Sequence, residues 1–198
     1  RNVTLVLGYM SESIVHFLDR NKNFGMNISY FAESEPRGTA GSLHLILDLK
    51  GDFILIYGDI IFDVYFKRFM DYHYEKGGIA TLLIHPNDHP YDSDLVQVDE
   101  NGRVNSFIMK NENKTLYSNK VNSGLFILRT DIIGHIPKSK ADLVNDVFPK
   151  LLKNKMNIYG YNSSEYVKDM GTPLRMKEIE KIMKSEKINS KNLRKPQP

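Results

Sequence analysis

The sequence Glu33-Ser-Glu-Pro-Arg-Gly-Thr-Ala-Gly41 leads from a glycine-rich turn into an apolar run that ends at Leu49. The strand-like Phe53-Ile-Leu-Ile-Tyr57 follows, and Gly58-Asp59 comes directly after it. A glycine-rich turn that enters a helix gathers backbone N–H groups that can face a phosphate or a base edge. A carboxylate at a strand end can hold a divalent cation. Together the two features predict a site for a ligand that has phosphates, a base and a bound metal ion, which describes a nucleotide.

Strand-like and helix-like patterns alternate through the first half of the chain. We expect strands at residues 3–7, 27–31, 53–57 and 80–84. The expected helices are one capped by Ser11, one over 43–49, and one that extends from Asp63 to near Gly77. The first strand has the β-branched composition of one buried on both faces. This alternation predicts an α/β fold with a mainly parallel, mixed sheet and helices on both faces. Ligands of such sheets bind at the carboxyl ends of strands, where Gly8, Glu33 and Asp59 fall.

The pattern changes after His85, where strand-like pieces are separated by turn-rich segments. The expected elements are strands at 95–98, 104–109, 121–128, 157–161 and 166–169, with a helix over 145–152. Hairpin-like connections between the first three predict antiparallel additions to the sheet. Thr172 is expected to cap a last helix that has Pro173 in its first position and its inner side formed by Leu174, Ile179, Ile182 and Met183. We expect one domain over 1–187 and a polar tail or linker over 188–198.

Composition sets broad limits on function. In 198 residues, 41% are hydrophobic, which is enough for one substantial core. The 27 Lys and Arg are interspersed with 24 Asp and Glu, which argues against a nucleic-acid partner. The chain has no cysteine, so disulfides and thiolate sites are excluded. We find no run of membrane-spanning length and no signal-peptide pattern, and therefore expect a cytoplasmic protein without a membrane partner. Because the chain starts at Arg1 and not at Met, we expect a fragment of a longer protein.

A second aspartate follows the last expected strand, in Asp169-Met-Gly-Thr-Pro173. Gly58-Asp59 alone could be an ordinary turn, since both residue types are common in turns. Two carboxylates from separate strands are what Mg²⁺ needs when phosphate oxygens supply most of its ligands, because the ion then takes only one or two protein groups. The pair Asp59 and Asp169 is therefore the expected magnesium site.

The order and spacing of these motifs resemble the sugar-1-phosphate nucleotidylyltransferases, the family that makes nucleotide sugars. The resemblance points most to the small bacterial branch that activates mannose or heptose 1-phosphates. It extends over nearly the whole chain and rests on Leu7-Gly-Tyr9, Glu33 with Pro36-Arg-Gly-Thr-Ala-Gly41, Gly58-Asp59, Phe107 to Lys110, Asn122-Ser-Gly124 and Lys168-Asp-Met-Gly-Thr-Pro173.

The resemblance implies a Rossmann-like domain that transfers a nucleotidyl group, GMP from GTP, to a hexose or heptose 1-phosphate and releases pyrophosphate. Asp59 and Asp169 would hold Mg²⁺, and Lys110 would pair with the sugar phosphate. The implied nucleotide-binding residues are Gly8, Glu33, Gly38, Thr39, Ala40, Gly41 and Gly58, and the implied sugar-binding residues are Asn122, Gly124 and Lys168. The expected partners are a nucleoside triphosphate and a sugar 1-phosphate, while a homo-oligomer and a further domain after the tail stay open.

Two departures from the family pattern affect this interpretation. The family's glycine-rich loop with an arginine and a following lysine, together with the central strand that carries it, is not among these residues. We therefore expect the isolated chain to be inactive and to have a gap in its core. Met109 stands where the family usually has a glutamate, and it cannot accept the hydrogen bonds of sugar hydroxyls as a carboxylate does.

Other functions fit the sequence less well. One alternative is a catalytically inactive regulatory domain that binds a nucleotide sugar. Another is a glycosyltransferase that uses Asp92-Ser-Asp94, although short acidic turns are common. His85 and His89 have the spacing of metal ligands, but they lie in a proline-bounded loop without a third ligand. The aromatic residues of the expected helix after Asp63 are better explained by core packing than by base stacking.

Overall fold

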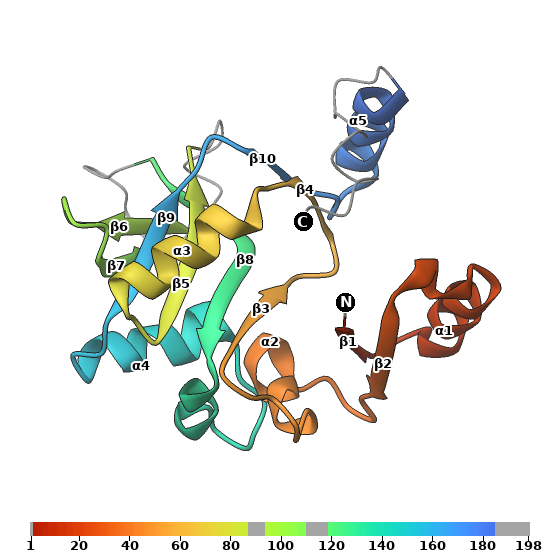
Figure 1. Cartoon of the computed structure of the whole chain (residues 1–198), viewed down its shortest axis with the longest axis horizontal. Helices are drawn as coiled ribbons and strands as arrows, with labels where there is room; N and C mark the ends of the chain where they lie inside the picture. The colour runs from red at the N-terminus through yellow and green to blue at the C-terminus, as the bar shows by residue number, and fades with distance from the viewer. Residues whose placement is uncertain (1, 87–93, 110–118, 185–198) are drawn as a thin grey trace. The chain divides into compact units, whose positions relative to one another are not determined.

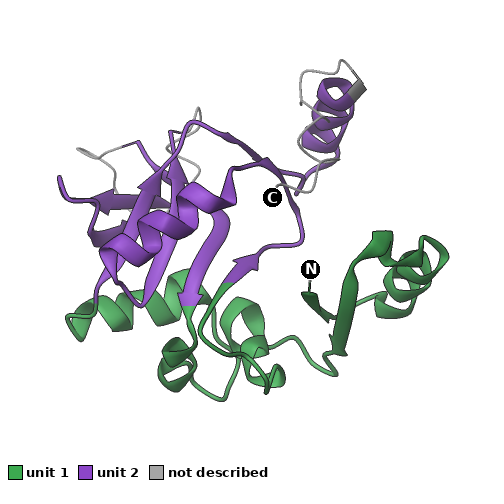
Figure 2. Ribbon diagram, viewed as in Figure 1, with its two compact units in different colours: residues 1–53, 129–156 green, residues 54–128, 157–198 purple. Residues whose placement is uncertain are grey.

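The computed structural model describes residues 2–86, 94–109 and 119–184 (Figure 1). The chain divides into two compact units (Figure 2): unit 1 contains residues 1–53 and 129–156, and unit 2 contains residues 54–128 and 157–198. Each unit is therefore built from two separate stretches of sequence. The expected polar tail lies outside the described residues.

Unit 1 begins with a strand, a helix and a second strand. β1 (Asn2–Leu7) pairs in parallel with β2 (Asn27–Ala32), and α1 (Ser11–Arg20) and the short helix η1 (Lys22–Gly25) connect them. The register places Asn2 opposite Asn27 and Leu7 opposite Ala32. The expected strand–helix–strand unit is therefore confirmed.

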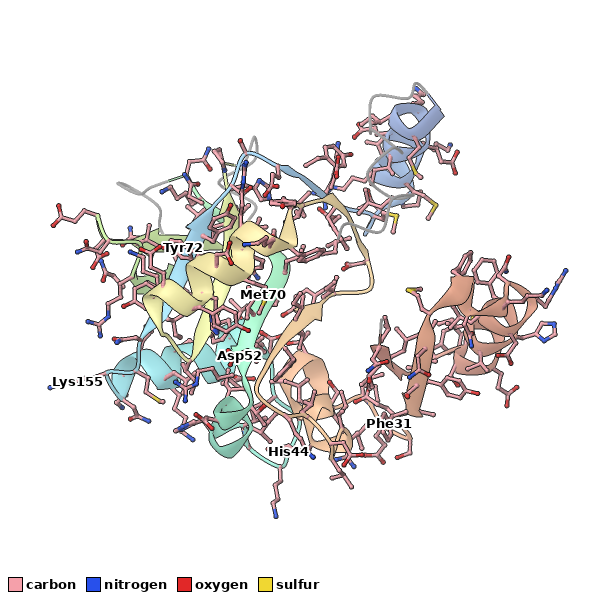
Figure 3. All side chains as sticks on the ribbon, viewed as in Figure 1. Phe31, His44, Asp52, Met70, Tyr72 and Lys155 are labelled. Carbon is pink, nitrogen blue, oxygen red and sulfur yellow. The ribbon has the colours of Figure 1, made fainter. Side chains whose placement is uncertain are left out.

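The expectation that the first strand is buried on both faces is wrong. Among the residues of β1 only Leu7 is buried, and β2 has no buried residue, with Phe31 38% exposed (Figure 3). A two-stranded sheet gives each strand one neighbour, and α1 contributes no buried side chain. The expected cap of α1 also differs, because Met10 and not Ser11 holds the cap position and no side chain bonds there.

The expected helix over 43–49 is wrong in its extent. A single helical turn, α2 (Gly38–Gly41), continues into the 3₁₀ turn η2 (Ser42–Leu45), and Ile46 is already extended. Leu43 is buried, whereas Leu47 is 87% exposed. A run of apolar residues does not distinguish a short 3₁₀ turn from a longer helix. The Nε2 atom of His44 lies 3.2 Å from the carbonyl oxygen of Ile136, which ties η2 to the second stretch of unit 1 (Figure 3).

That second stretch is mainly helical. It contains η4 (Thr130–His135), the π-helical turn η5 (Leu143–Val147) and α4 (Phe148–Lys153). The helix expected over 145–152 is thus confirmed, with its first turn starting two residues earlier. Phe148 and Leu151 are fully buried.

Most of the remaining strands were expected from the sequence, and the observed ends of these strands lie within one residue of the expected ends. They are β3 (Asp52–Ile56), β5 (Ala80–His85), β6 (Leu95–Val98), β7 (Val104–Ile108), β8 (Val121–Arg129), β9 (Ile158–Asn162) and β10 (Tyr166–Asp169). Six of them form one sheet in the order β7-β6-β8-β5-β9, with β3 paired to β8.

The sheet is mixed, as expected, but it is not mainly parallel. β9 pairs in parallel with β5, while antiparallel pairings join β5 to β8, β6 to β8 and β6 to β7. A short turn over residues 99–103 accounts for the β6–β7 pair, since strands joined by short turns pair antiparallel. The antiparallel pairs of β8 with β5 and β6 join strands that are not consecutive in sequence. The antiparallel additions inferred for the second half of the chain are confirmed.

The helix expected to open at Asp63 begins three residues later. Residues Ile60–Asp63 form the strand β4, which pairs antiparallel with β10, and α3 covers Phe66–Lys76. The backbone N–H of Tyr65 donates to a carboxylate oxygen of Glu165 at 2.7 Å, so a distant residue helps to set this boundary. The end of α3 agrees with expectation, because Gly77 has a φ of +63° and terminates it.

The core of unit 2 forms where α3 packs on the sheet. Phe69 from α3, Leu83 from β5, and Leu125 and Ile127 from β8 are completely buried and contact one another. The hydroxyl of Tyr72, also on α3, donates to the carbonyl oxygen of Gly160 on β9 (Figure 3). Burial raises the pKa of Tyr72 above its usual value. A second polar contact joins His73 Nδ1 on α3 to Thr81 Oγ1 on β5 at 2.7 Å. Helix α3 is thus attached to the sheet by apolar packing and by polar contacts.

The last described helix is α5 (Pro173–Lys184). Its expected start is confirmed, since the N–H of Arg175 donates to Thr172 Oγ1 at 3.3 Å and Pro173 is the first helical residue. Its inner side is only partly as expected: Ile179 is buried, whereas Leu174 and Met183 are exposed. None of the described helices is both long and apolar enough to cross a bilayer.

Truncating the buried aromatic residue of α3 tests the core of unit 2. We expect Phe69→Ala to lower the free energy of unfolding by about 3–5 kcal/mol, because it removes a large buried side chain and leaves a cavity. Tyr74→Ala on the same helix, where the ring is 61% exposed, should change it by less than about 0.5 kcal/mol. Urea unfolding followed by circular dichroism measures both, and equal losses would contradict the packing described.

Candidate functional site

The glycine loop after β2 is held against a neighbouring segment of unit 1. Gly38 has a φ of +76°, and a Cβ atom at this position would lie 2.4 Å from the carbonyl oxygen of Ala141. A Cβ atom on Gly41 would lie 3.0 Å from the carbonyl oxygen of Ser139. Gly38 therefore needs glycine, because another backbone segment approaches closely and φ is positive there. At Gly41 a side chain would require the neighbouring backbone to shift by a few tenths of an ångström.

Within residues 37–41 of this loop, three of the five N–H groups have partners in the protein. Those of Ala40 and Gly41 both donate to the carbonyl oxygen of Ala141, at 3.0 and 3.2 Å, and the N–H of Arg37 donates to Glu33 Oε1 at 3.2 Å. In the described part of unit 1, the N–H groups of Gly38 and Thr39 have no protein acceptor. Glu33, Ala40 and Gly41 thus shape the loop, and two N–H groups remain for a ligand.

Thr39 has a structural partner that the sequence interpretation missed. Its hydroxyl donates to Asp142 Oδ2 at 2.6 Å and accepts the N–H of Leu143 at 2.8 Å. The other oxygen of Asp142 accepts the N–H groups of Val144 and Asn145, so Asp142 caps η5. Aspartate directly before an apolar helical run is a capping signal, and that pattern was the available clue.

In unit 2 the structure brings Asp59 and Asp169 together. β4 and β10 place Asp169 opposite Ile60, and the N–H of Met170 donates to the carbonyl oxygen of Asp59 at 2.6 Å. A Cβ atom on Gly171 would lie 3.2 Å from Asp169 Oδ1 and 3.9 Å from Asp59 Oδ2. These two carboxylate oxygens are therefore no more than about 7 Å apart.

Two ion pairs lie beside the aspartates. Arg175 Nη1 contacts Asp169 Oδ1 at 2.5 Å, and the same oxygen accepts the N–H of Gly171 at 3.2 Å. Lys168 Nζ donates to Glu178 Oε2 at 2.7 Å, and this hydrogen bond is the main cause that raises the pKa of Lys168 and lowers that of Glu178. The sequence interpretation missed Arg175. Its signal is a cation in the first turn of a helix, where the helix dipole disfavours positive charge unless an acid is nearby.

Asn122 and Gly124 lie in a bulge of β8. The pairing with β5 passes from Leu82 opposite Phe126 to Ile84 opposite Asn122, so β8 has extra residues there. Asn122 Oδ1 accepts the N–H of Gly124 at 3.2 Å. Gly124 has a φ of +79°, and its carbonyl oxygen accepts the N–H of Tyr57 at 3.0 Å. Bulges often re-aim side chains beside functional sites.

The other residues that the sequence indicated as site residues make few contacts in the structure or lie outside its described part. Gly8 and Gly58 are exposed and follow β1 and β3. Lys110, His89 and Asp92 lie outside the described residues, and His85 Nδ1 contacts the neighbouring carbonyl oxygen of Pro86 at 2.7 Å. No cluster of three or more His, Cys, Asp or Glu suited to a metal ion occurs in the described ranges. The aspartate pair thus fits an ion that takes its other ligands from a bound phosphate group or from water.

The strands and helices define an α/β protein, and comparison with known proteins identifies its family. The nucleotidyl transferase family model matches residues 1–186, so the chain belongs to the nucleotidyl transferase family. The resemblance inferred from the motifs is thereby confirmed.

Curated relatives are similar over most of this chain. The mannose-1-phosphate guanyltransferase of Saccharomyces cerevisiae is 30% identical over 179 residues, which cover 87% of this chain and 49% of the relative. The mannose-1-phosphate guanylyltransferase catalytic subunit beta of Drosophila melanogaster is 29% identical over 178 residues, covering 87% of this chain and 47% of the relative. The chain therefore spans about half the length of these relatives.

Solved structures share the fold. The crystal structure of HddC from Yersinia pseudotuberculosis matches with a TM-score of 0.77 and 22% identity, covering 89% of this chain and 76% of that chain. The same protein complexed with GMP-PN gives a TM-score of 0.75 at 23% identity, with 90% and 77% covered. At these identities the likeness supports the fold alone.

The close contact between Gly38 and Ala141 leads to a prediction about unit 1. We expect Gly38→Ala to lower the free energy of unfolding by at least about 1–2 kcal/mol, because a left-handed backbone strains an alanine and the new methyl group meets a carbonyl oxygen. The control is Gly134→Ala, also in unit 1, which has open space around its Cβ position and should be nearly neutral. Thermal unfolding measures both, and a neutral Gly38→Ala would contradict the described loop.

Proposed function

We propose that this chain forms part of an enzyme that transfers GMP from GTP to a hexose or heptose 1-phosphate and releases pyrophosphate. The observation that supports it most is the placement of Asp59 and Asp169 at one end of the β4–β10 pair, in a chain of the nucleotidyl transferase family. Relatives named as mannose-1-phosphate guanylyltransferases support guanine as the base and a sugar 1-phosphate as the acceptor.

The donor set of the aspartate pair fits Mg²⁺. Two carboxylates supply hard oxygen ligands, and an octahedral ion that also binds phosphate oxygens and water needs no third protein ligand. We propose that Asp59 and Asp169 hold this ion. When bound, Mg²⁺ would supply charge neutralisation on the phosphates.

The proposed reaction needs positioning more than covalent chemistry. An oxygen of the sugar phosphate attacks the α-phosphorus of GTP, a new P–O bond forms, and the bond to the pyrophosphate oxygen breaks. Asn122 and Gly124, held in the bulge of β8, are proposed to orient the sugar. Lys168 is proposed to contact the sugar as well, and Lys110 is proposed to place positive charge near the sugar phosphate.

The base is proposed to contact the glycine loop. The N–H groups of Gly38 and Thr39, which have no acceptor in the described part of unit 1, are suited to carbonyl or nitrogen acceptors on a base edge. Gly8, Glu33 and Gly58 follow strand ends and are proposed to line the nucleotide. Which sugar binds is expected to differ from the usual family preference, because Met109 replaces the glutamate that binds sugar hydroxyls.

The glycine-rich loop with its arginine and lysine is not part of these 198 residues, so we propose that the chain does not turn over by itself. The test therefore uses a protein that contains this chain together with that segment of the family. Pyrophosphate release is measured with each of the four NTPs and with mannose 1-phosphate or heptose 1-phosphate. GTP should be the best donor. Binding of an NDP-sugar by calorimetry without any turnover would favour the regulatory alternative and overturn the proposed reaction.

Substitution of either aspartate tests the metal assignment. In the same protein we expect Asp59→Asn and Asp169→Asn each to lower kcat/KM by about 100-fold or more, because each removes a negative charge from the metal site. The control, Asp71→Asn on α3, removes a carboxylate whose partner is the exposed Lys67 and should leave activity unchanged. Full activity in either site variant would show that the metal is held elsewhere.

A further inference from the structure

We infer that Arg175 is a tethered counter-ion of the aspartate pair, which competes with the divalent cation for Asp169 and weakens its binding. The inference rests on the proposed function, because it takes Asp59 and Asp169 as the metal ligands. It adds a residue that sets the affinity of the site for its metal without binding the metal itself.

The contact between Arg175 and Asp169 is direct and local. The guanidinium Nη1 atom lies 2.5 Å from Asp169 Oδ1, and that oxygen also accepts the N–H of Gly171. A carboxylate oxygen has two lone pairs, so these two donors occupy Oδ1 fully. This oxygen also lies 3.2 Å from the Cβ position of Gly171, which Asp59 Oδ2 approaches to 3.9 Å, so Oδ1 is the oxygen of Asp169 known to lie on the side of Asp59. A cation that binds there must therefore displace the guanidinium or use only the other oxygen.

The backbone keeps the guanidinium near the site even when its ion pair is broken. Arg175 is the third residue of α5, and its N–H is bonded to Thr172 Oγ1. Only the turn of residues 170–172 separates the end of β10 from the start of α5. The arginine and its aspartate are thus parts of one short segment, and ion pairing costs little chain entropy.

Arg175 changes the net charge of the group of side chains around the aspartate pair. Asp59, Asp169 and Glu178 are negative, while Lys168 and Arg175 are positive, so the group carries one net negative charge. Removing Arg175 doubles that charge. The side chains of Arg175 and Asp169 are 42% and 44% exposed, so solvent screens the interaction and the effect on a dication should be moderate.

The experiment measures Mn²⁺ alone, by its electron paramagnetic resonance signal, in titrations of the 198-residue chain. Arg175→Gln should tighten Mn²⁺ binding by about 3- to 10-fold, because a competing positive charge is gone. Arg175→Lys, which keeps the charge but loses the planar guanidinium, should lie between Arg175→Gln and the unchanged chain. Lys177→Gln, an exposed position on the same helix with the same change of charge, should bind Mn²⁺ as the unchanged chain does.

A gain in affinity separates this role from damage to the structure, since a misfolded site binds metal more weakly. Unchanged or weaker binding in Arg175→Gln, while Asp169→Asn still reduces binding, would overturn the inference and leave the metal site intact. If Asp59→Asn and Asp169→Asn leave Mn²⁺ binding unaltered, the aspartate pair is not the metal site, and the metal assignment fails together with the inference. If the gain seen with Arg175→Gln disappears when Asp169→Asn is added, the competition acts through Asp169 as inferred.

Discussion

The pairing of β4 with β10 is the constraint on which the aspartate site depends. Asp59 directly precedes β4 and Asp169 ends β10, so an antiparallel register with Asp169 opposite Ile60 brings both carboxylates to one end of the pair. A shift by one residue would turn the side chains of β10 to the opposite face. The hydrogen bond from the Met170 N–H to the Asp59 carbonyl oxygen continues this register past the last paired residues.

Bringing two carboxylates close together has an electrostatic cost that neighbouring cations offset. At a separation of about 7 Å, two unit negative charges repel by about 0.6 kcal/mol in a water-like medium, and by more where solvent is partly excluded. Arg175 lies against one of the two aspartates, and Lys168 occupies the preceding position on β10. The ion pair with Arg175 thus offsets part of the repulsion between the two aspartates, while Lys168 pairs with Glu178.

The sequence was sufficient for elements that have a strong local signal. The strands expected in the second half of the chain, the glycine end of α3 and the Thr172-Pro173 start of α5 were all predicted correctly. Features decided by distant partners were not. β4 was missed because its conformation depends on β10, and Leu47 was misplaced because apolar composition does not reveal where a chain turns outward. The partners of Thr39 and Asp169 likewise required the folded chain.

The contacts of Ala141 and Asp142 with the glycine loop also affect the order in which parts of the protein can fold during synthesis. The hydroxyl of Thr39 and the carboxylate of Asp142 are 103 residues apart in sequence, and the Ala141 carbonyl that fixes Ala40 and Gly41 precedes Asp142 by one. At translation rates of about 5–20 residues per second, roughly 5–20 s pass between the synthesis of the loop and that of Ala141 and Asp142. By the end of that interval β4 to β8 of unit 2 have been synthesised, whereas the nascent loop has lacked its partners throughout. A nucleotide pocket that includes this loop can thus become rigid only after Ala141 and Asp142 have been added to the chain.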